Sequence, residues 1–228
     1  GRNIHEKDLT LAIALQAAQE LRRRKIPVAL TRTEDREVPL EERTALANRL
    51  RAGVFISLHM NSAQGYRKGV AEGVETYILS HSTNQSSVQL ARLENKVLKG
   101  SHVDASGTGG DVPLILKDLL LGANLGESRG LACALQTHLV EVTTSPRDQT
   151  YRDRGVKQSL FYVLLGADMP STLVELGFID HPRDRFLVMT SDGRTRTARA
   201  IADAIAEYRL ARQGDLAMRS RLSKCPVR

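Results

Sequence analysis

The chain of 228 residues is long enough for one large domain or two small ones, and its hydrophobic share of 41% suffices for a core. Its formal net charge of +7 favours anionic partners, but acidic residues are also plentiful and the arginines are scattered. No basic helix or aromatic platform accompanies the charge, so we expect no nucleic-acid binding. No apolar run approaches the roughly 20 residues of a membrane-spanning helix, so we expect no membrane span.

Helical and strand patterns alternate along the first part of the chain. An apolar residue recurs every fourth position from Leu9 to Leu21, which predicts a helix that Asp8 caps and Pro27 ends. The elements expected next are a strand at Val28–Thr31, a helix at Leu40–Arg51, strands at Val54–Leu58 and Val74–Leu79, and a helix at Leu90–Leu98.

The second part of the chain begins with a glycine-rich loop at Gly100–Gly110, followed by a compact apolar segment at Val112–Leu121. The elements expected after it are a helix at Glu127–Val142, a loop at Thr143–Asp153, strands at Phe161–Leu165 and Ser171–Glu175, and a helix at Thr197–Leu210. The alternation predicts an α/β fold, a single domain with a mainly parallel or mixed central sheet flanked by helices. We expect the domain to span residues 1–210, with a helical insertion at about 91–131 and a frayed basic tail at 211–228.

The two cysteines, Cys133 and Cys225, stand far apart and form no CxxC pair. Whether a disulfide joins them is left open by the sequence. The favoured interpretation is one buried thiol and one tail thiol.

Two strands end in residues that can carry chemistry. The apolar strand at Val54–Leu58 delivers His59 at its end, where open α/β sheets place their ligand sites and where imidazole is a common metal ligand. The other strand ends at Glu175, flanked by apolar residues, where a carboxylate is costly unless its charge is used. Glu175 can bind metal or act as a general base, although a salt bridge to an arginine explains it equally well.

Short motifs that carry a resemblance follow one another along the chain. They are Glu6-Lys7-Asp8, Leu30-Thr31-Arg32 with Asp35, Arg43 with Ala47-Asn48, Phe55–Asn61, Gly73–Tyr77, Arg154–Lys157 and Pro170–Ile179. Together they resemble the zinc-dependent amidase 3 family of N-acetylmuramoyl-L-alanine amidases, over about residues 4 to 210. In that family His, Glu and His hold the zinc, and a glutamate in Val-Glu-x-Gly-Phe assists catalysis.

The resemblance assigns Glu6 and His59 to zinc and Glu175 to catalysis. The family's first zinc histidine lies upstream of the Glu6 motif, so we expect a further histidine before residue 1. His5 is a poor substitute, because adjacent side chains of extended backbone point to opposite faces. One departure is Asp180-His181, where the family often has Ser-Asn.

The resemblance implies hydrolysis of the bond between N-acetylmuramic acid and L-alanine of peptidoglycan, in the periplasm or outside the cell, for wall remodelling and cell separation. Asn61 and Arg154 are candidate substrate contacts. The alternatives are that Asn61 caps a turn and that Arg154 and Lys157 belong to a solvated basic loop. Glu75 is interpreted as one half of a structural charge pair. The alternatives are a zinc peptidase acting on wall peptides and a non-catalytic relative that binds wall precursors or a partner.

The insertion suggests regulation. Some Gram-negative relatives in the family carry a helix here that blocks the zinc cleft until an activator protein displaces it. The segment Leu114–Leu121 is a candidate for that helix, and Glu94 or Asp118 is a candidate to occupy the metal's open position. The alternative is a helix that packs into the core.

Overall fold

A computed structural model describes residues 4–62, 71–80, 82, 84–97, 124–143 and 153–227. In chain order the elements are α1 (Glu6–Arg23), α2 (Leu40–Arg49), β1 (Phe55–Asn61), β2 (Val74–Leu79), α3 (Gln85–Glu94), a 3₁₀ turn (Asn95–Val97), α5 (Leu125–Thr143), β3 (Asp153–Ser159), α6 (Tyr162–Leu165), β4 (Ser171–Phe178), α7 (Pro182–Met189), α8 (Ser191–Arg212) and α9 (Leu216–Ser223). The expected α/β fold is confirmed, as a single domain with a mixed central sheet.

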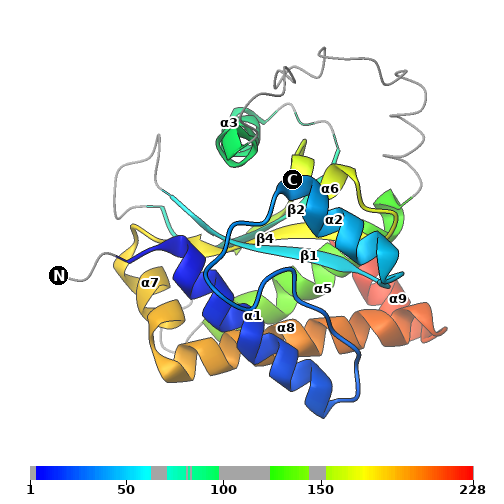
Figure 1. Ribbon diagram of the computed structural model, residues 1–228. Helices are drawn as coiled ribbons and strands as arrows, with labels where there is room; N and C mark the ends of the chain where they lie inside the picture. The colour runs from blue at the N-terminus through cyan, green and yellow to red at the C-terminus, as the bar shows by residue number, and fades with distance from the viewer. Residues whose placement is uncertain are drawn as a thin grey trace, which may run out of the picture.

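The sheet has the strand order β1-β4-β2-β3, so the last strand in sequence lies between the first two (Figure 1). β1 runs parallel to β4 and β2 runs parallel to β3, whereas β2 and β4 are antiparallel. Glu175 is the register partner of His59 on one side and of Glu75 on the other. The topology therefore brings three ionisable residues from three strands together across the sheet.

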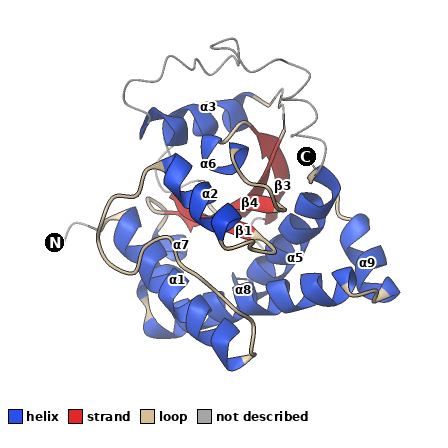
Figure 2. Ribbon diagram, turned by 45° about the vertical axis from the view of Figure 1, so that its right-hand side comes forward, coloured by secondary structure: helices blue, strands red, loops and turns tan. Residues whose placement is uncertain are grey.

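Helices cover both faces of the sheet (Figure 1 and Figure 2). The larger hydrophobic cluster packs α1, α5 and α8 against one face, and the smaller cluster packs α2, α3 and α6 against the other. Because side chains alternate along a strand, Leu173 and Tyr77 point into the smaller cluster while Val174 and Ile78 point into the larger one. The same alternation places Glu175, two residues beyond Leu173, on the face that α3 covers.

Two predicted strands are wrong, and one strand was missed. Val28–Thr31 has no partner strand among the described residues; it runs as irregular chain beside α1, where Arg32 donates to the Lys7 carbonyl at 2.6 Å. Phe161–Leu165 contains the short helix α6, since a brief apolar run does not distinguish a strand from a helical turn. β3 was missed because its sequence, Asp-Arg-Gly-Val-Lys-Gln-Ser, lacks an apolar pattern.

The C-terminal tail is ordered rather than frayed. It forms α9, and Cys225 is joined to Cys133 of α5 by a disulfide with Cα atoms 5.9 Å apart, which corrects the interpretation of two separate thiols. Arg129 donates to the Cys225 carbonyl at 2.5 Å, and Val227 forms a parallel bridge with Val156 on β3. The tail thus lies along α5 and the edge of the sheet, which places the two cysteines within bonding range.

Of two expectations about segments, only one concerns residues that the structure describes. None of the described helices is long and apolar enough to cross a membrane. The candidate blocking segment Leu114–Leu121 and Asp118 lie outside the described residues, as does the glycine-rich loop.

Candidate functional site

The site forms where β1 and β4 end. Both strands are parallel and their carboxyl ends meet at one edge of the sheet, so the paired residues His59 and Glu175 lie side by side there. Ser57 and His59 are two positions apart on β1 and share a face. The prediction that the strand ends at Glu175 is wrong, because β4 continues to Phe178, but the structure does bring Glu175 beside His59.

His59 contacts carboxylates from two helices. Its Nδ1 lies 3.1 Å from Oε1 of Glu6 and 2.9 Å from Oε2 of Glu94, and its Nε2 lies 3.2 Å from the Ser57 hydroxyl. Burial disfavours the imidazolium, but Glu6 and Glu94 outweigh it and raise the pKa of His59 to about 10. The environment of Nδ1 therefore strongly favours positive charge.

Glu6 is the first residue of α1, and its position is fixed from the backbone of β1. Its Oε1 accepts a hydrogen bond from the Met60 amide at 3.1 Å. Burial opposes ionisation, but the contact with His59 and its charge, the Met60 amide and Arg32 together lower the pKa of Glu6. Asp8, expected to cap this helix, lies within its first turn, and His5 occupies the cap position.

Glu175 is fully buried, and neither of its carboxylate oxygens has a hydrogen-bond partner. Burial raises the pKa of this carboxyl well above its ordinary value; His59 opposes the shift, and Glu94, Glu6 and Glu75 add to it. A buried carboxyl without hydrogen bonds is unfavourable for folding. This combination of burial, raised pKa and a neighbouring imidazole is typical of functional sites.

Glu94 is the last residue of α3, and its side chain reaches the site from above the sheet. Its side chain is 26% exposed, and its carboxylate is the nearest described carboxylate to His59 Nδ1. One ligand atom from each of His59, Glu94 and Glu175 lies within 4.8 Å of the others. The sequence named Glu94 as a candidate for this location, and the structure brings it there.

The residues at this position fit a zinc ion. Zinc in proteins takes imidazole nitrogen and carboxylate oxygen. Both Glu175 oxygens are buried and make no hydrogen bond, and His59 Nδ1 is faced only by carboxylates, as expected of atoms prepared for a cation. Glu6 and Glu94 converge on the same nitrogen. Ser57 holds the other ring nitrogen, a support that metal-binding histidines usually have.

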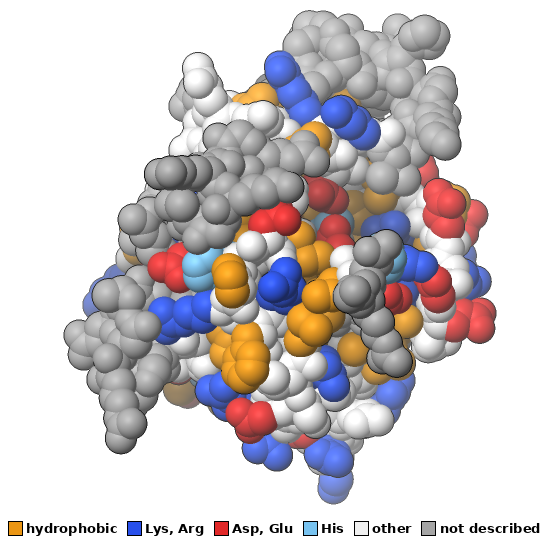
Figure 3. Space-filling model, turned by 90° about the vertical axis from the view of Figure 1, so that its left-hand side faces the viewer, with side chains coloured by type: hydrophobic (Ala, Val, Ile, Leu, Met, Phe, Trp, Pro, Cys, Tyr) orange, Lys and Arg blue, Asp and Glu red, His pale blue; other side chains and the backbone are white. Residues whose placement is uncertain are grey.

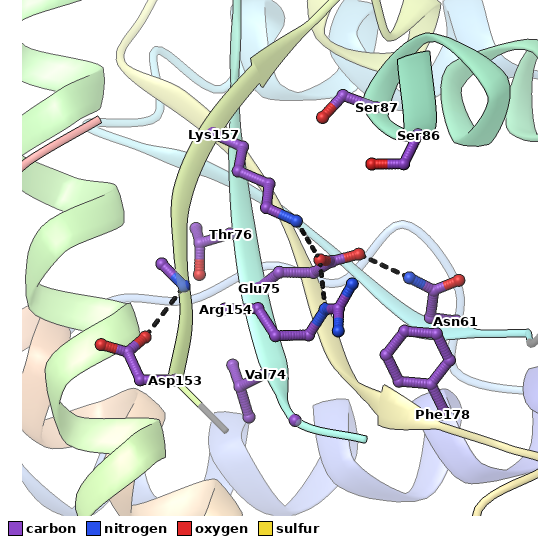
Figure 4. A network of polar contacts seen from close by, with 12 residues as sticks. Asn61, Val74, Glu75, Thr76, Ser86, Ser87, Asp153, Arg154, Lys157 and Phe178 are labelled. Carbon is purple, nitrogen blue, oxygen red and sulfur yellow. Dashed lines mark hydrogen bonds and ion pairs between the residues drawn. The ribbon is translucent and has the colours of Figure 1, made fainter. Parts of the chain in front are cut away.

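Next to this site Glu75 forms the centre of a buried charge network (Figure 4). Its Oε2 is 2.8 Å from Nε of Arg154 and 2.5 Å from Nζ of Lys157, and its Oε1 accepts from Nδ2 of Asn61 at 2.6 Å. The guanidinium of Arg154 also lies over the Phe178 ring, 5.0 Å from its centre. The interpretation of Glu75 as half of a charge pair is confirmed, and the basic residues lie in a strand rather than a solvated loop.

The surface supports a site at this edge. On the face drawn in Figure 3, acidic side chains and a histidine lie together in a hollow, whereas Lys and Arg side chains are dispersed. A cavity of about 560 Å³ lies between the start of α5, the end of α8 and α9. Glu6, His59, Glu94 and Glu175 do not line this cavity, so the size of a cavity does not identify the candidate site in this protein.

Sequence reasoning missed two features of the site. Ser57 was not singled out, although its spacing of two from His59 on a strand would have indicated a shared face. The network around Glu75 was seen only as a pair, because its members come from three strands whose order the sequence does not reveal.

The chain is similar to known proteins in both sequence and structure. The protein-family model described as N-acetylmuramoyl-L-alanine amidase matches residues 1–207. The N-acetylmuramoyl-L-alanine amidase AmiA of Salmonella typhimurium is 31% identical over 211 residues, which cover 91% of this chain and 70% of that protein. AmiA of Escherichia coli K12 is 29% identical with the same coverage. The crystal structure of an N-acetylmuramoyl-L-alanine amidase from Clostridium difficile 630 superposes with a TM-score of 0.65 at 26% identity, covering 90% of this chain and 84% of that one.

Proposed function

This chain belongs to the N-acetylmuramoyl-L-alanine amidase family, and from that premise we propose a zinc-dependent enzyme that hydrolyses the bond between N-acetylmuramic acid and L-alanine in peptidoglycan. Activity as a peptidoglycan amidase is what the family and the relatives support. The choice of bond follows the family and the relatives, whereas the zinc dependence rests on the site. The observation that carries the zinc dependence is the buried carboxyl of Glu175, without a hydrogen bond, beside an imidazole that two further carboxylates face.

In the proposed mechanism Glu6 and His59 would hold the metal. Zinc bound there would supply Lewis acidity to the scissile carbonyl and to the attacking water. Glu175, whose pKa burial raises, takes the proton from that water and passes it to the leaving amine. A base with a raised pKa suits both steps, because it accepts a proton and remains a good acid.

The substrate contacts of this mechanism lie beside Glu175. We propose that Asn61 and Arg154 meet the stem peptide of peptidoglycan. Their support is their place around Glu75, the register partner of Glu175, at the same end of the sheet. Glu75 orients both side chains, so that a peptide carboxylate would meet a donor held in one position.

The experiment that tests the function identifies the bond cleaved. The natural full-length protein is loaded with zinc and given purified peptidoglycan, and the released fragments are analysed by mass spectrometry. We expect intact stem peptides that begin with L-alanine, and we expect His59→Ala to lose both zinc and product, because it removes the nitrogen that Glu6 and Glu94 face. His138→Ala, on α5 and outside the site, is the matched control and keeps both.

The other functions predict different products. Peptides cut between amino acids would identify a zinc peptidase. Zinc binding without any product would identify a non-catalytic relative. Either result contradicts the proposed amidase.

The Glu94 carboxylate is placed to compete with substrate and water for the metal. This carboxylate lies 2.9 Å from the same His59 nitrogen that Glu6 faces, and it enters from the end of α3, at the start of the insertion. We propose that Glu94 occupies the metal's open position in a resting state and that an activator protein removes it by moving α3. α3 has a small apolar contact with the sheet, through Leu90 and Ala91, which suits an element that is displaced.

Replacing Glu94 with Gln is expected to raise the basal rate of peptidoglycan hydrolysis. A hydrogen bond to a charged group contributes about 1.5–3 kcal/mol, and about 1.4 kcal/mol is a factor of ten, so the rate should rise about ten- to a hundred-fold. Release of labelled peptidoglycan fragments measures the rate. Gln89→Ala, at an exposed position of the same helix, is the control. An unchanged or lower rate for Glu94→Gln would show that α3 does not inhibit.

The location and organisation of the chain are further parts of the proposal. The Cys133–Cys225 disulfide supports an oxidising compartment, which suits a periplasmic or extracellular enzyme of the cell envelope. A role in wall remodelling and cell separation follows from the substrate. We retain a catalytic domain at about 1–210 with a regulatory insertion at about 91–131, and the basic tail carries α9.

A further inference from the structure

A second group of metal-ligand side chains lies at the start of α7, and it shares no residue with the candidate active site. It consists of Glu72, just before β2, and of His181 and Asp184, which flank the first turn of α7. One ligand atom from each of the three lies within 4.8 Å of the others. His181 is where the chain departs from the amidase motif, so this group is tied to a distinctive residue of this protein.

His181 Nδ1 lies 3.5 Å from Oδ1 of Asp184, which is long for a hydrogen bond but suits two ligands of one ion. Oε2 of Glu72 lies 3.6 Å from the other ring nitrogen, Nε2, which cannot bind the same ion as Nδ1. Glu72 belongs to the group because it offers a ligand atom within 4.8 Å of those of the other two residues. Ligands about 2.0–2.1 Å from a zinc ion at tetrahedral angles are about 3.4 Å apart. The separation between Nδ1 and Oδ1 therefore matches a shared cation better than a direct bond.

Two buried polar atoms in this group make no hydrogen bond. Asp184 is fully buried; its Oδ2 accepts hydrogen bonds from the Gly73 and Phe178 amides at 3.0 and 2.8 Å, while its Oδ1 has none. His181 Nδ1, the nitrogen that faces this oxygen, has none either. The two amides fix the orientation of the carboxylate, so Oδ1 is held toward His181. Buried polar atoms normally have hydrogen-bond partners, so two facing atoms without one, Asp184 Oδ1 and His181 Nδ1, point to a ligand between them.

We propose that Glu72, His181 and Asp184 bind a divalent transition-metal cation, zinc in the first instance. An imidazole with two carboxylates is a donor set that zinc accepts, and the two negative charges balance the charge of the ion. The ion would tie the loop before β2 to the start of α7 and to the end of β4, through the Asp184 bond to Phe178. The role is structural: it braces the edge of the sheet where the candidate active site also lies.

Zinc content tests the proposal. The chain is stripped of metal, dialysed against zinc alone at low micromolar concentration, and analysed for bound zinc by mass spectrometry. His181→Asn and Glu72→Gln are expected to bind one zinc ion fewer per chain than the unaltered protein, while keeping its circular dichroism spectrum. Zinc should also raise the Tm of the unaltered chain more than that of either variant, because a ligand that binds the folded state stabilises it.

Two controls separate this site from the others. His138→Asn removes a histidine that also faces two carboxylates, Glu207 at 2.7 Å and Glu141 at 3.7 Å, and should leave the zinc content unchanged. The comparison is repeated in a His59→Ala background, where the candidate catalytic site has lost its imidazole. A zinc loss on His181→Asn in that background supports the second site even if the proposed catalytic zinc fails.

The opposite result is equally clear. If His181→Asn and the unaltered chain bind the same amount of zinc in both backgrounds, the three side chains hold no zinc, and the proposal is overturned. A crystal soaked in zinc and measured at the zinc absorption edge is a separate test. An anomalous peak between His181 and Asp184 supports the site, and a peak elsewhere without one here refutes it.

Discussion

Glu175→Gln is expected to lower kcat for peptidoglycan hydrolysis by about 10²–10⁴-fold, the usual contribution of a positioned general base. The amide has nearly the same shape as the carboxyl but cannot accept a proton from water. Because both Glu175 oxygens are buried without a hydrogen bond, losing the charge removes an unfavourable burial, and the variant should fold at least as stably. The measurements are the rate with zinc-loaded natural protein, the zinc content and the Tm.

The control for this prediction is another buried glutamate. Glu207 on α8 is 6% exposed and belongs to a pair with His138, away from the site. Glu207→Gln should change the rate little, whatever it does to stability. If Glu175→Gln kept a rate within a few-fold of the unaltered enzyme, Glu175 would not be the base, and a structural role for its carboxyl would have to be sought.

Glu75→Ala is expected to lower the free energy of unfolding by about 3–5 kcal/mol, the cost of breaking a buried ion pair by removing one partner. Glu75 is 2% exposed, and its removal leaves the buried Lys157 and the partly buried Arg154 without their shared carboxylate. Urea unfolding followed by circular dichroism measures the change. Glu41→Ala, at an exposed position of α2, should stay within about 0.5 kcal/mol and serves as the control.

The stability that the Glu75 network contributes should depend on pH. Burial opposes ionisation of Glu75, but Lys157 and Arg154 outweigh it and lower its pKa from the ordinary value of 4.5. A group with a lowered pKa in the folded state stabilises the fold above its unfolded pKa and loses that contribution as the pH falls through its folded pKa. The stability gap between the unaltered chain and Glu75→Ala should therefore hold at neutral pH and shrink below about pH 4.5. A gap independent of pH would mean that packing, not charge, stabilises this region.

The sequence predicts the fold well where the pattern is strong. β1 and β4 are found because each is an apolar run that leads to a polar residue, and the strand Val74–Leu79 has the predicted bounds. β3 is not predicted, because its sequence is polar and its side chains are stabilised in the sheet by partners on other strands. The main example is the ion pair between Lys157 and Glu75. The disulfide is not found because nothing local shows that the tail returns to α5.

The site divides in the same way. His59 and Glu175 could be predicted because each follows an apolar run in one of two parallel strands that are paired in register, although β4 continues beyond Glu175 to Phe178. Glu6 depends on the resemblance, since an acid at a helix start is common; only the fold shows that it bonds to the Met60 amide. Glu94 and Asp184 act through contacts between elements distant in sequence, which periodicity cannot supply.

The strand order also determines when the enzyme can first work. β4 is the last strand to be synthesised, yet β1 and β2 each pair with it rather than with each other. A growing chain that stops before Ser171 therefore has no Glu175 and no strand to hold His59 near Glu75. In the proposed mechanism, such an incomplete product would lack the base for the hydrolysis of peptidoglycan. The strand order therefore delays assembly of the candidate site until β4 has been made.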